Sequence, residues 1–498
     1  MRKCIAWLLM MAVLLTMAAG AYAQEPVMMA GFDDESTGHE WETNGFFQKM
    51  QEMTGISFVF SQYGNYEEWT AAKAGMLAGD VALPDVLFKA HLSTAETMAW
   101  YEQGKLIDLK PLMEENAPNL WALLQANPEW EKAITLPDGA IVALPSINEL
   151  QNNNAMWINT TWLDNIGMEM PTTVEELTEV LRDFRDRDAN FNGKQDEVPL
   201  TFIGMWDLKF LGHAFGVIAN DYGVTMDEDG AVREMLTSDN NRAFLTWLNQ
   251  LWEEGLLDEN GFMSTDSLRQ ITDADATIPY GMMFAATPLS VVPSEKLGEY
   301  AMLMPLRYEG EQKYRDLTGD IIRGAFAITS ACKDPVAMLK WVDFLYTEEG
   351  YRLAQAGTEG EHYVWNEDGT WTWLGDSQTV AMTVLQEVTI LEGGTMPGLC
   401  SIPFQQAYEE ATTAAIIEQM YALKQHAVQP YPLVYLSEEQ SARIAEIWAD
   451  AGYYAEYTMA NFVTGDIELN DDTWNEFCQT LNSKGLQEMV ALWQEAAK

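Results

Sequence analysis

Short apolar runs alternate with longer amphipathic segments in the first part of the chain. The runs typical of strands are Val27–Ala30, Ile56–Phe60 and 84–88, and the helix-like segments are 41–54 and 66–78. This alternation favours a parallel sheet, because parallel strands need a long crossover that is usually helical. It predicts an α/β fold with a doubly wound sheet, in which ligands bind at the carboxyl ends of the strands. No Gly-rich phosphate fingerprint follows the first strand, so a nucleotide is not expected.

A second constraint is the segment 188–197, in which side chains that carry oxygen recur at close spacing. Its first, third, fifth, sixth and ninth positions are Asp188, Asn190, Asn192, Gly193 and Asp196. This spacing matches the first part of an EF-hand calcium loop, in which the Gly allows a sharp turn. The twelfth position is Pro199 and not Glu, so the loop is expected to leave a helix and enter a strand over 198–203. The alternative is an Asn/Gly-rich turn with a solvated acidic rim. The preceding helix is expected to begin at a capping box formed by Thr172 and Glu175.

The N-terminus has the features of a secretory signal peptide over residues 1–23. Two basic residues precede an apolar run over 5–19, and a small-x-small cleavage signal ends at Ala23. The run is too short to span a bilayer, and no later stretch is long enough, so no transmembrane segment is expected in the mature chain. The tripeptide 18–20 is followed by Ala21 and not by the Cys of a bacterial lipoprotein. The protein is therefore predicted to be exported to the periplasm or the extracellular space without acylation.

The composition excludes several classes of partner. The net charge is −48, with 28 basic and 76 acidic side chains. Nucleic-acid binders present basic clusters, and none occurs here, so no nucleic-acid partner is expected. The same charge repels anionic membranes. Cys332, Cys400 and Cys478 follow the cleavage site, an odd number that excludes a complete disulfide framework and leaves one unassigned pair open. Three Cys and few His give no zinc pattern.

The length of the chain exceeds one ordinary domain and fits two large lobes. After the signal peptide, 1–23, the expected division is an N-terminal lobe of 24–146 plus about 320–370 and a C-terminal lobe of 147–319 plus about 371–498. The first crossover between the lobes is predicted at Pro145, which follows the apolar run Ile141–Leu144. The second is predicted at the strand Ile321–Thr329.

Ordered short blocks occur along nearly the whole mature chain. They are Leu83–Val86, Gly104–Leu112 with Ala117–Asn119, Asp138–Pro145, Trp157–Asn159 leading to Trp162–Gly167, Pro171–Leu177, the calcium loop with Pro199, Thr347–Gly350 followed by Gly357–Tyr363, and Phe462–Gly465 followed by Trp474. Each block alone is weak evidence. The ordered set resembles the family 1 extracellular solute-binding proteins of bacterial ABC importers, and most of all the large oligosaccharide-binding type with a calcium loop, which includes alginate-oligosaccharide binders.

The resemblance implies a two-lobed periplasmic-binding fold of type II, whose lobes close on a ligand about a hinge. It implies that the protein binds a carbohydrate and hands it to ABC permease subunits, without catalysis, and the protein is expected to act as a monomer. The residues that match the calcium ligands of the family are Asp188, Asn190, Asn192, Asp196 and Glu197, with Lys194 through its backbone carbonyl. The calcium ion would then be structural and would stabilise the folded state. The missing lipoprotein Cys departs from the family pattern.

A carbohydrate site needs flat aromatic side chains with carboxylates, amides and Arg at their edges, because sugars present apolar faces ringed by hydroxyls. Several of the 18 Trp residues fall in predicted loops or at strand ends, where the cleft is expected. The candidate ligand-binding residues are Asp33, Asp34 and Trp41 after the first strand, Asn148, Glu149 and Trp157 at the first crossover, Trp206 and Asp207 after the strand that begins at Val198, Arg323 on the second crossover strand, and His362, Tyr363 and Trp365 after the turn at 357–360.

Each of these residues has a structural alternative. A Trp at helical spacing is usually a core residue, and this is the interpretation for Trp247, Trp252 and Trp341. For Arg323 the competing role is a structural ion pair. For His362 the alternative is a surface position without a role in ligand binding.

Three other functions remain as alternatives. A secreted glycoside hydrolase needs a pair of carboxylates across the scissile bond, but no pair is singled out, and neither a nucleophile elbow nor a zinc-protease helix occurs. A glycan-binding module without a permease would share the fold and the site. A binder of peptides or metal chelates would share the fold. With only 28 basic residues in the chain, neutral oligosaccharides are favoured over uronates.

Overall fold

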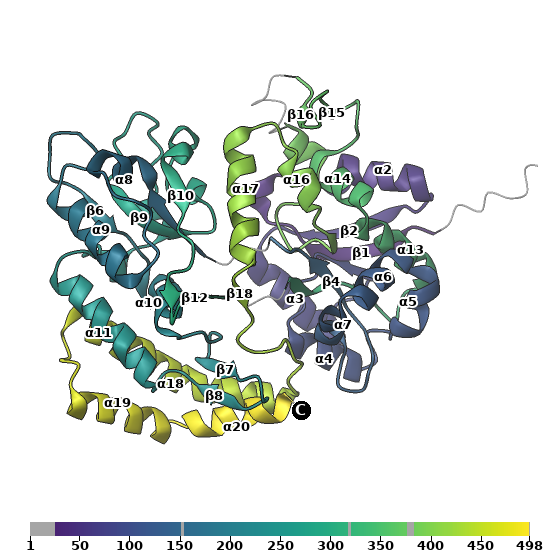
Figure 1. Cartoon of the computed structure of the whole chain (residues 1–498). Helices are drawn as coiled ribbons and strands as arrows, with labels where there is room; N and C mark the ends of the chain where they lie inside the picture. The colour runs from purple at the N-terminus through teal and green to yellow at the C-terminus, as the bar shows by residue number, and fades with distance from the viewer. Residues whose placement is uncertain (1–24, 151–153, 317–319, 376–382, 498) are drawn as a thin grey trace, which may run out of the picture.

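The computed structural model describes residues 25–150, 154–316, 320–375 and 383–497, and the predicted signal peptide lies outside them. The molecule consists of two α/β lobes, with helix α17 (Ala411–Lys424) between them (Figure 1). The two-lobed α/β prediction is confirmed. Within the described ranges, no helix is both long and apolar enough to cross a membrane.

The first lobe is built on a mixed sheet with the strand order β17-β4-β14-β3-β1-β2. Its strands are β1 (Val27–Phe32), β2 (Phe58–Tyr63), β3 (Val86–Phe88), β4 (Leu144–Ile147), β14 (Ile321–Ile328) and β17 (Gly398–Leu399). β1 runs parallel to β2 and β3, whereas β14 is antiparallel to β3 and β4. Met29, Val86 and Phe88 enter one core cluster, and Ala30 and Leu87 enter another. This division follows from the two-residue period of a strand, which sends neighbouring side chains to opposite faces.

Helices cover this sheet. They are α2 (Gly45–Thr54), α3 (Tyr66–Ala78), α4 (Thr94–Glu102), α5 (Lys110–Asn116), α6 (Pro118–Ala126), α7 (Pro128–Ile134), α13 (Pro335–Asp343) and α14 (Glu348–Ala356). The side chains of Asn44, Asn65 and Ser93 accept the first free N–H groups of α2, α3 and α4, as good N-caps do. Trp341 of α13 is buried and its ring lies near that of Phe88, so its prediction as a core residue is correct.

The second lobe is built on a sheet with the order β10-β5-β9-β6. Its main elements are β5 (Ala155–Asn159), β6 (Val198–Leu200), β9 (Tyr280–Ala285), β10 (Tyr300–Met302), α8 (Thr160–Ile166), α9 (Val174–Asp186), α10 (Gly204–Leu208), α11 (Asp239–Glu253), α18 (Glu438–Thr464), α19 (Asp471–Ser483) and α20 (Leu486–Ala496). One hydrophobic core joins the sheet to the C-terminal helices. Trp247 is buried in this core and Trp252 packs against it, as predicted.

Small paired strands complete the structure. They are β7 (Val224–Met226) with β8 (Val232–Glu234), β11 (Arg307–Tyr308) with β12 (Glu311–Gln312), β13 (Tyr314–Arg315) with β18 (Ala427–Val428), and β15 (Tyr363–Trp365) with β16 (Trp371–Trp373). β17 pairs with β4 of the first sheet, which differs from the predicted assignment of residues after about 370 to the second lobe. The chain leaves the first lobe later, after α16 (Ile402–Gln406), and returns to the second through α17.

Candidate functional site

The predicted calcium loop follows α9 directly. Both carboxylate oxygens of Asp188 accept backbone N–H groups, from Asn192 at 3.0 Å and from Gly193 at 2.9 Å. The side-chain amides of Asn190 and Asn192 donate to Asp196 Oδ1 at 3.3 and 2.8 Å. Gly193 has a left-handed backbone with φ 78°, which favours glycine at the sharp turn. The loop therefore draws the oxygen-bearing side chains of Asp188, Asn190, Asn192 and Asp196 together.

Glu197 supplies an independent test of whether this loop fits a cation. Its Oε1 atom is buried and has no hydrogen-bond partner in the described part of the chain, whereas Oε2 accepts the N–H of Asp196 at 3.1 Å. A buried carboxylate oxygen without a partner is costly unless a positive charge or a donor compensates it. The hydrogen bond from Asn192 is the largest influence that holds the pKa of Asp196 below its usual value. These groups and the carbonyl of Lys194 match the oxygen ligands that Ca²⁺ prefers.

The donor set of the loop mixes amides, carboxylates and a carbonyl. In the described part of the chain, no group of three or more His, Cys, Asp or Glu side chains gathers as a metal site. Cys332, Cys400 and Cys478 are all free thiols in the structure, and the unassigned disulfide that their number left open is not formed.

Asp33 and Trp41 lie in the interior of the first lobe. The Asp33 carboxylate accepts hydrogen bonds from Trp41 Nε1 at 2.7 Å and from His39 Nδ1 at 3.0 Å, and it pairs with Lys89 Nζ at 2.9 Å. Lys89 also donates to the carbonyl of Glu392. Burial acts to raise the pKa of Asp33, but the bond from His39 and the charge of Lys89 outweigh it and keep the group ionised. The ligand roles predicted for Asp33 and Trp41 are wrong, because both side chains are buried and are satisfied by protein partners.

Asp34, Asn148 and Arg323 lie at the carboxyl edge of the first sheet, where the predicted cleft should be. Asp34 caps a short 3-10 turn by accepting the N–H of Ser36 at 2.9 Å. Asn148 lines a cavity together with Tyr351 and Cys400. Arg323 donates to the Val434 carbonyl at 2.8 Å and lies over the Tyr435 ring at 5.0 Å. Among the described residues it therefore binds the segment before α18, and not the carboxylate that a structural ion pair would need.

Glu149 lies at the first crossover and lines a cavity between the lobes. Lys424 of α17 and Asp320 line the same cavity, and they form an ion pair with each other. Glu149 therefore faces the segments that connect the lobes, next to the chain's second crossover.

The three candidates of the second lobe have different environments. Trp157 is 0% exposed in the central strand β5 and donates to the Ala285 carbonyl at 3.0 Å, so its predicted ligand role is wrong. Asp207 is also buried, and burial raises its pKa to about 6 despite the charge of Arg269 3.6 Å away. Trp206 is 52% exposed although its neighbours are buried. It lies on helix α10 and not at the end of a strand, since β6 stops at Leu200.

His362, Tyr363 and Trp365 belong to a separate aromatic cluster on the first lobe. His362 Nδ1 accepts the N–H of Thr358 at 2.9 Å, which closes the turn before β15. Tyr363 is buried, and Trp365 packs edge-on against Phe404 with ring centres 5.8 Å apart. Both rings pack between the β15–β16 hairpin and α16, and the ligand roles predicted for Tyr363 and Trp365 stay predictions.

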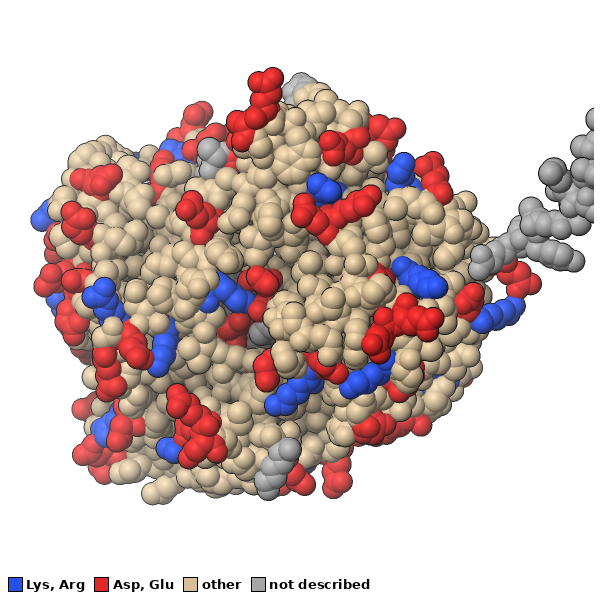
Figure 2. Space-filling model, turned by 45° about the vertical axis from the view of Figure 1, so that its right-hand side comes forward, with Lys and Arg blue, Asp and Glu red and all other residues tan. Residues whose placement is uncertain are grey.

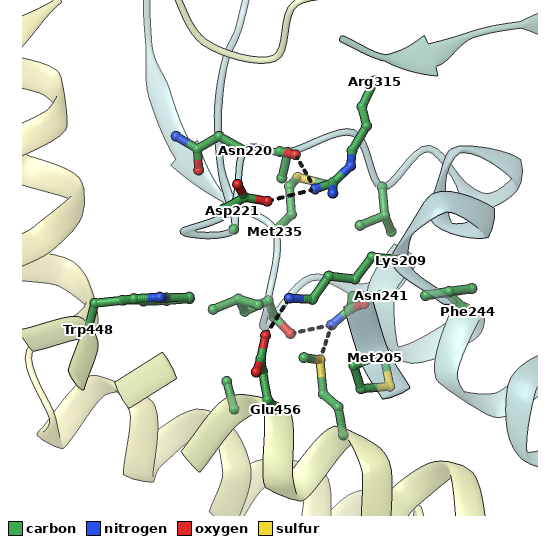
Figure 3. A pocket seen from close by; sticks show the side chains of 16 residues that line it. Met205, Lys209, Asn220, Asp221, Met235, Asn241, Phe244, Arg315, Trp448 and Glu456 are labelled. Atoms are coloured by element: carbon green, nitrogen blue, oxygen red, sulfur yellow. Dashed lines mark hydrogen bonds and ion pairs between the residues drawn. The ribbon is translucent and has the colours of Figure 1, made fainter. Parts of the chain in front are cut away.

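The second lobe contains a pocket that the sequence did not predict, here termed the Arg315 pocket (Figure 3). Its walls include Lys209, Asp221, Phe244, Arg315, Trp448 and Glu456. The Arg315 guanidinium lies over the Phe210 ring at 4.6 Å, and the ring of Trp206 meets Phe210 edge-on with centres 6.4 Å apart. Trp206 and the guanidinium of Arg315 thus both lie next to Phe210. No local pattern marks these residues, because Arg315 and Trp448 are far apart in sequence.

Comparison with known proteins adds an evolutionary relationship to this geometry. A model of the family described as bacterial extracellular solute-binding protein matches residues 20–352. The chain is 28% identical over 476 residues to the fructooligosaccharide ABC transporter substrate-binding protein FusA of Streptococcus pneumoniae, covering 90% of this chain and 85% of that protein. The structure of FusA in complex with kestose has a TM-score of 0.72 at 25% identity and covers 95% of this chain and 99% of that one. An EF-hand mutant of FusA in complex with fructo-nystose has also been solved and has the same TM-score of 0.72.

Two further solved structures share the fold. An extracellular solute-binding protein from Bifidobacterium longum subsp. infantis has a TM-score of 0.79 at 21% identity and covers 96% of this chain and 99% of that one. The alginate-binding protein AlgQ2 without calcium ion has a TM-score of 0.65 at 19% identity, with the same coverage of 96% and 99%. The resemblance predicted from the ordered sequence blocks is confirmed. Since the family model matches more than half of its length, the chain belongs to the bacterial extracellular solute-binding protein family.

Proposed function

We propose that the protein captures an oligosaccharide between its two lobes and delivers it to the permease of an ABC importer. The observation that carries this proposal is the match to FusA over 90% of the chain. The proposal includes binding without catalysis, export to the periplasm or the extracellular space after cleavage near Ala23, and action as a monomer. The description of the matched family as extracellular supports the location.

The geometry of the second lobe supports a sugar ligand. The exposed indole of Trp206 offers a flat apolar surface, and the residues after α10, Lys209–Phe215, pack on β13 next to β18. β18 lies where the chain passes between the lobes (Figure 1). A large side chain left exposed on this lobe suits the apolar face of a sugar ring. Carboxylates are scattered over the face in Figure 2, with no basic patch, which favours a neutral glycan over a polyanion.

Replacement of Trp206 by alanine tests the sugar-binding proposal. We expect binding of kestose, the trisaccharide held by FusA, to weaken about 10- to 100-fold, because burying an aromatic side chain under a ligand is worth about 1.5–3 kcal/mol. The melting temperature should hardly change, because surface substitutions alter stability by less than about 0.5 kcal/mol. Isothermal titration calorimetry measures the affinity. Phe191→Ala removes an aromatic side chain of 68% exposure from the calcium loop and is the matched control. Unchanged affinity for every sugar in a panel of neutral and uronic oligosaccharides would contradict the role of Trp206.

We also propose that Asp188, Asn190, Asn192, Asp196, Glu197 and the Lys194 carbonyl hold a structural calcium ion. Support comes from the unpartnered Oε1 of Glu197, from the EF-hand spacing, and from the existence of an EF-hand mutant of FusA. The loop lies between α9 and β6 of the second lobe, away from the Arg315 pocket. The ion would neutralise the carboxylates of the loop and tie the end of α9 to the start of β6.

Removal of calcium is expected to destabilise the second lobe. An ion present at 100 times its dissociation constant stabilises the folded state by about 2.7 kcal/mol, so EDTA should lower the melting temperature and added Ca²⁺ should restore it. Differential scanning calorimetry measures the shift. Asp188→Asn should abolish the response to EDTA, whereas Asp186→Asn, a change to the last residue of α9, should keep it. A melting temperature that is the same with and without EDTA, together with metal analysis that finds no calcium, would refute the site.

A further inference from the structure

The edge of the Arg315 guanidinium formed by Nε and Nη2 has no partner among the residues that the structure describes. Arg315 is 5% exposed, and its Nε and Nη2 atoms are buried with no hydrogen-bond acceptor among the described residues. Its Nη1 atom donates to the Ala219 carbonyl at 3.3 Å and lies 3.5 Å from an oxygen of Asp221. Leaving buried donors unpaired is costly, and a charged group is the most costly case. An acceptor that a ligand brings into the pocket would satisfy these two donors.

Other arginines of this chain show what that edge normally binds. Arg182 uses Nε and Nη2 to hold both carboxylate oxygens of Glu254, and Arg443 holds both oxygens of Glu488 with the same two atoms at 2.6 and 2.8 Å. Such fork-like contacts are strong and fix the geometry of the acceptor. Arg315 presents the same fork, so its missing partner should carry two adjacent oxygen atoms.

The charge balance of the pocket indicates which pair of oxygens fits. Lys209 is neutralised by Glu456 at 2.7 Å, and Arg315 has Asp221 close by. A carboxylate on the ligand would add an unbalanced negative charge beside two acidic side chains. A pair of adjacent hydroxyl groups supplies two acceptor oxygens without this repulsion.

The rest of the pocket offers the apolar surface that a sugar ring needs. The indole of Trp448 extends into the pocket from α18, and it approaches from a different side than Arg315 (Figure 3). Phe244 and Met459 are further apolar lining residues. An aromatic face opposed to a fork of N–H donors matches a sugar unit with one apolar face and adjacent hydroxyls.

We infer that the Arg315 pocket binds one neutral sugar unit of the oligosaccharide, through adjacent hydroxyl oxygens on Arg315 Nε and Nη2 and through stacking on Trp448. This inference rests on the proposed function and names a subsite for it. Trp206 and Arg315 both contact Phe210, so the glycan would pass from the exposed indole into the pocket.

The test compares matched variants of the full mature chain by titration calorimetry with kestose. Arg315→Lys keeps the charge but loses the fork, and its affinity should fall about 10- to 100-fold, since hydrogen bonds to charged groups are worth about 1.5–3 kcal/mol. Trp448→Ala should weaken binding by a similar factor, whereas Trp448→Phe should retain most of the affinity. Arg443→Lys removes a fork that is already occupied on the outer surface of α18 and should bind as the wild type does.

The outcomes separate this subsite from the general function. If the wild type binds kestose and both Arg315→Lys and Trp448→Ala bind equally well, the subsite is overturned while the sugar-binding proposal stands. If Arg315→Lys weakens only the binding of an alginate trisaccharide, the acceptor is a carboxylate and the assignment to hydroxyls is overturned. If the wild type binds no sugar of the panel, the proposed function itself fails. Melting curves of each variant show that a loss of affinity is not a loss of folding.

Discussion

Replacement of Asp33 by alanine is expected to destabilise the protein by about 3–5 kcal/mol, the cost of leaving a buried charge without its partner. The Asp33 carboxylate is fully buried and compensates Lys89, which is itself fully buried. It also receives hydrogen bonds from His39 and Trp41. The substitution would leave all three donors facing a small cavity. It would also loosen the segment around Gly393, whose position against Asp33 leaves no room for a Cβ.

Urea denaturation with far-ultraviolet circular dichroism measures this loss. Asp34→Ala is the matched control, because the neighbouring carboxylate lies nearer the surface and only caps a short 3-10 turn, so its removal should cost about 1 kcal/mol or less. The double variant Asp33→Ala/Lys89→Met should recover part of the lost stability, since it removes the stranded charge as well. A loss of less than about 1 kcal/mol for Asp33→Ala would show that water or a rearrangement replaces the carboxylate.

Acid is expected to destabilise the protein through two histidines whose pKa is lowered by burial, one in each lobe. His213 Nδ1 donates to the Phe210 carbonyl at 2.5 Å and its Nε2 accepts the N–H of Leu306 at 3.0 Å. His91 Nε2 accepts the N–H of Thr395 at 2.9 Å. Burial lowers the pKa of both residues from 6.5 to about 4, so both are neutral at pH 7.

The sign of the effect follows from the protons bound by each state. Between pH 6.5 and about 4, the unfolded chain protonates these histidines and the folded protein does not, so the free energy of unfolding falls as the pH falls through this window. Across this pH window the free energy of unfolding falls by about 3 kcal/mol for His213 and by somewhat less for the more exposed His91. Denaturation curves at several pH values measure the slope. His213→Gln should lower stability at pH 7 yet flatten the slope below pH 6.5. An unchanged slope would mean that His213 is protonated in the folded protein.

The elements that sequence patterns predicted well are those whose signal is local. Each strand–helix unit of the first lobe shows its own periodicity, so β1, β2, α2 and α3 appear close to their predicted places. Capping is local too, although the N-cap of α9 is Thr173, one position after the predicted Thr172. The Thr173 side chain accepts the N–H of Glu176, and the Glu176 carboxylate accepts the N–H of Thr172. β17 is only two residues long and carries no periodicity, which is why the boundary near 370 was misplaced.

The candidate site was harder to predict, because exposure is a property of the whole fold. Trp157 and Trp206 both follow turn-like sequences, yet the central strand β5 buries the first between β9 and β10, and helix α10 exposes the second. Arg315 and Trp448 line one pocket because α18 returns to the second lobe after the chain has built most of the first. A residue pattern within a short stretch of sequence cannot predict that two such distant residues line the same pocket.

The segments that form the second lobe lie far apart in the sequence, and this separation affects when the lobe can fold. Its core joins β5 to helices α18, α19 and α20, which form the end of the described chain. Contacts between residues so distant in sequence form slowly, because closing a long loop is entropically unfavourable before the contacts stabilise it. The second lobe must therefore remain loose until the last helices have emerged from the ribosome. In the export that we propose, this delay would keep the second lobe unfolded and able to pass through a narrow secretion channel.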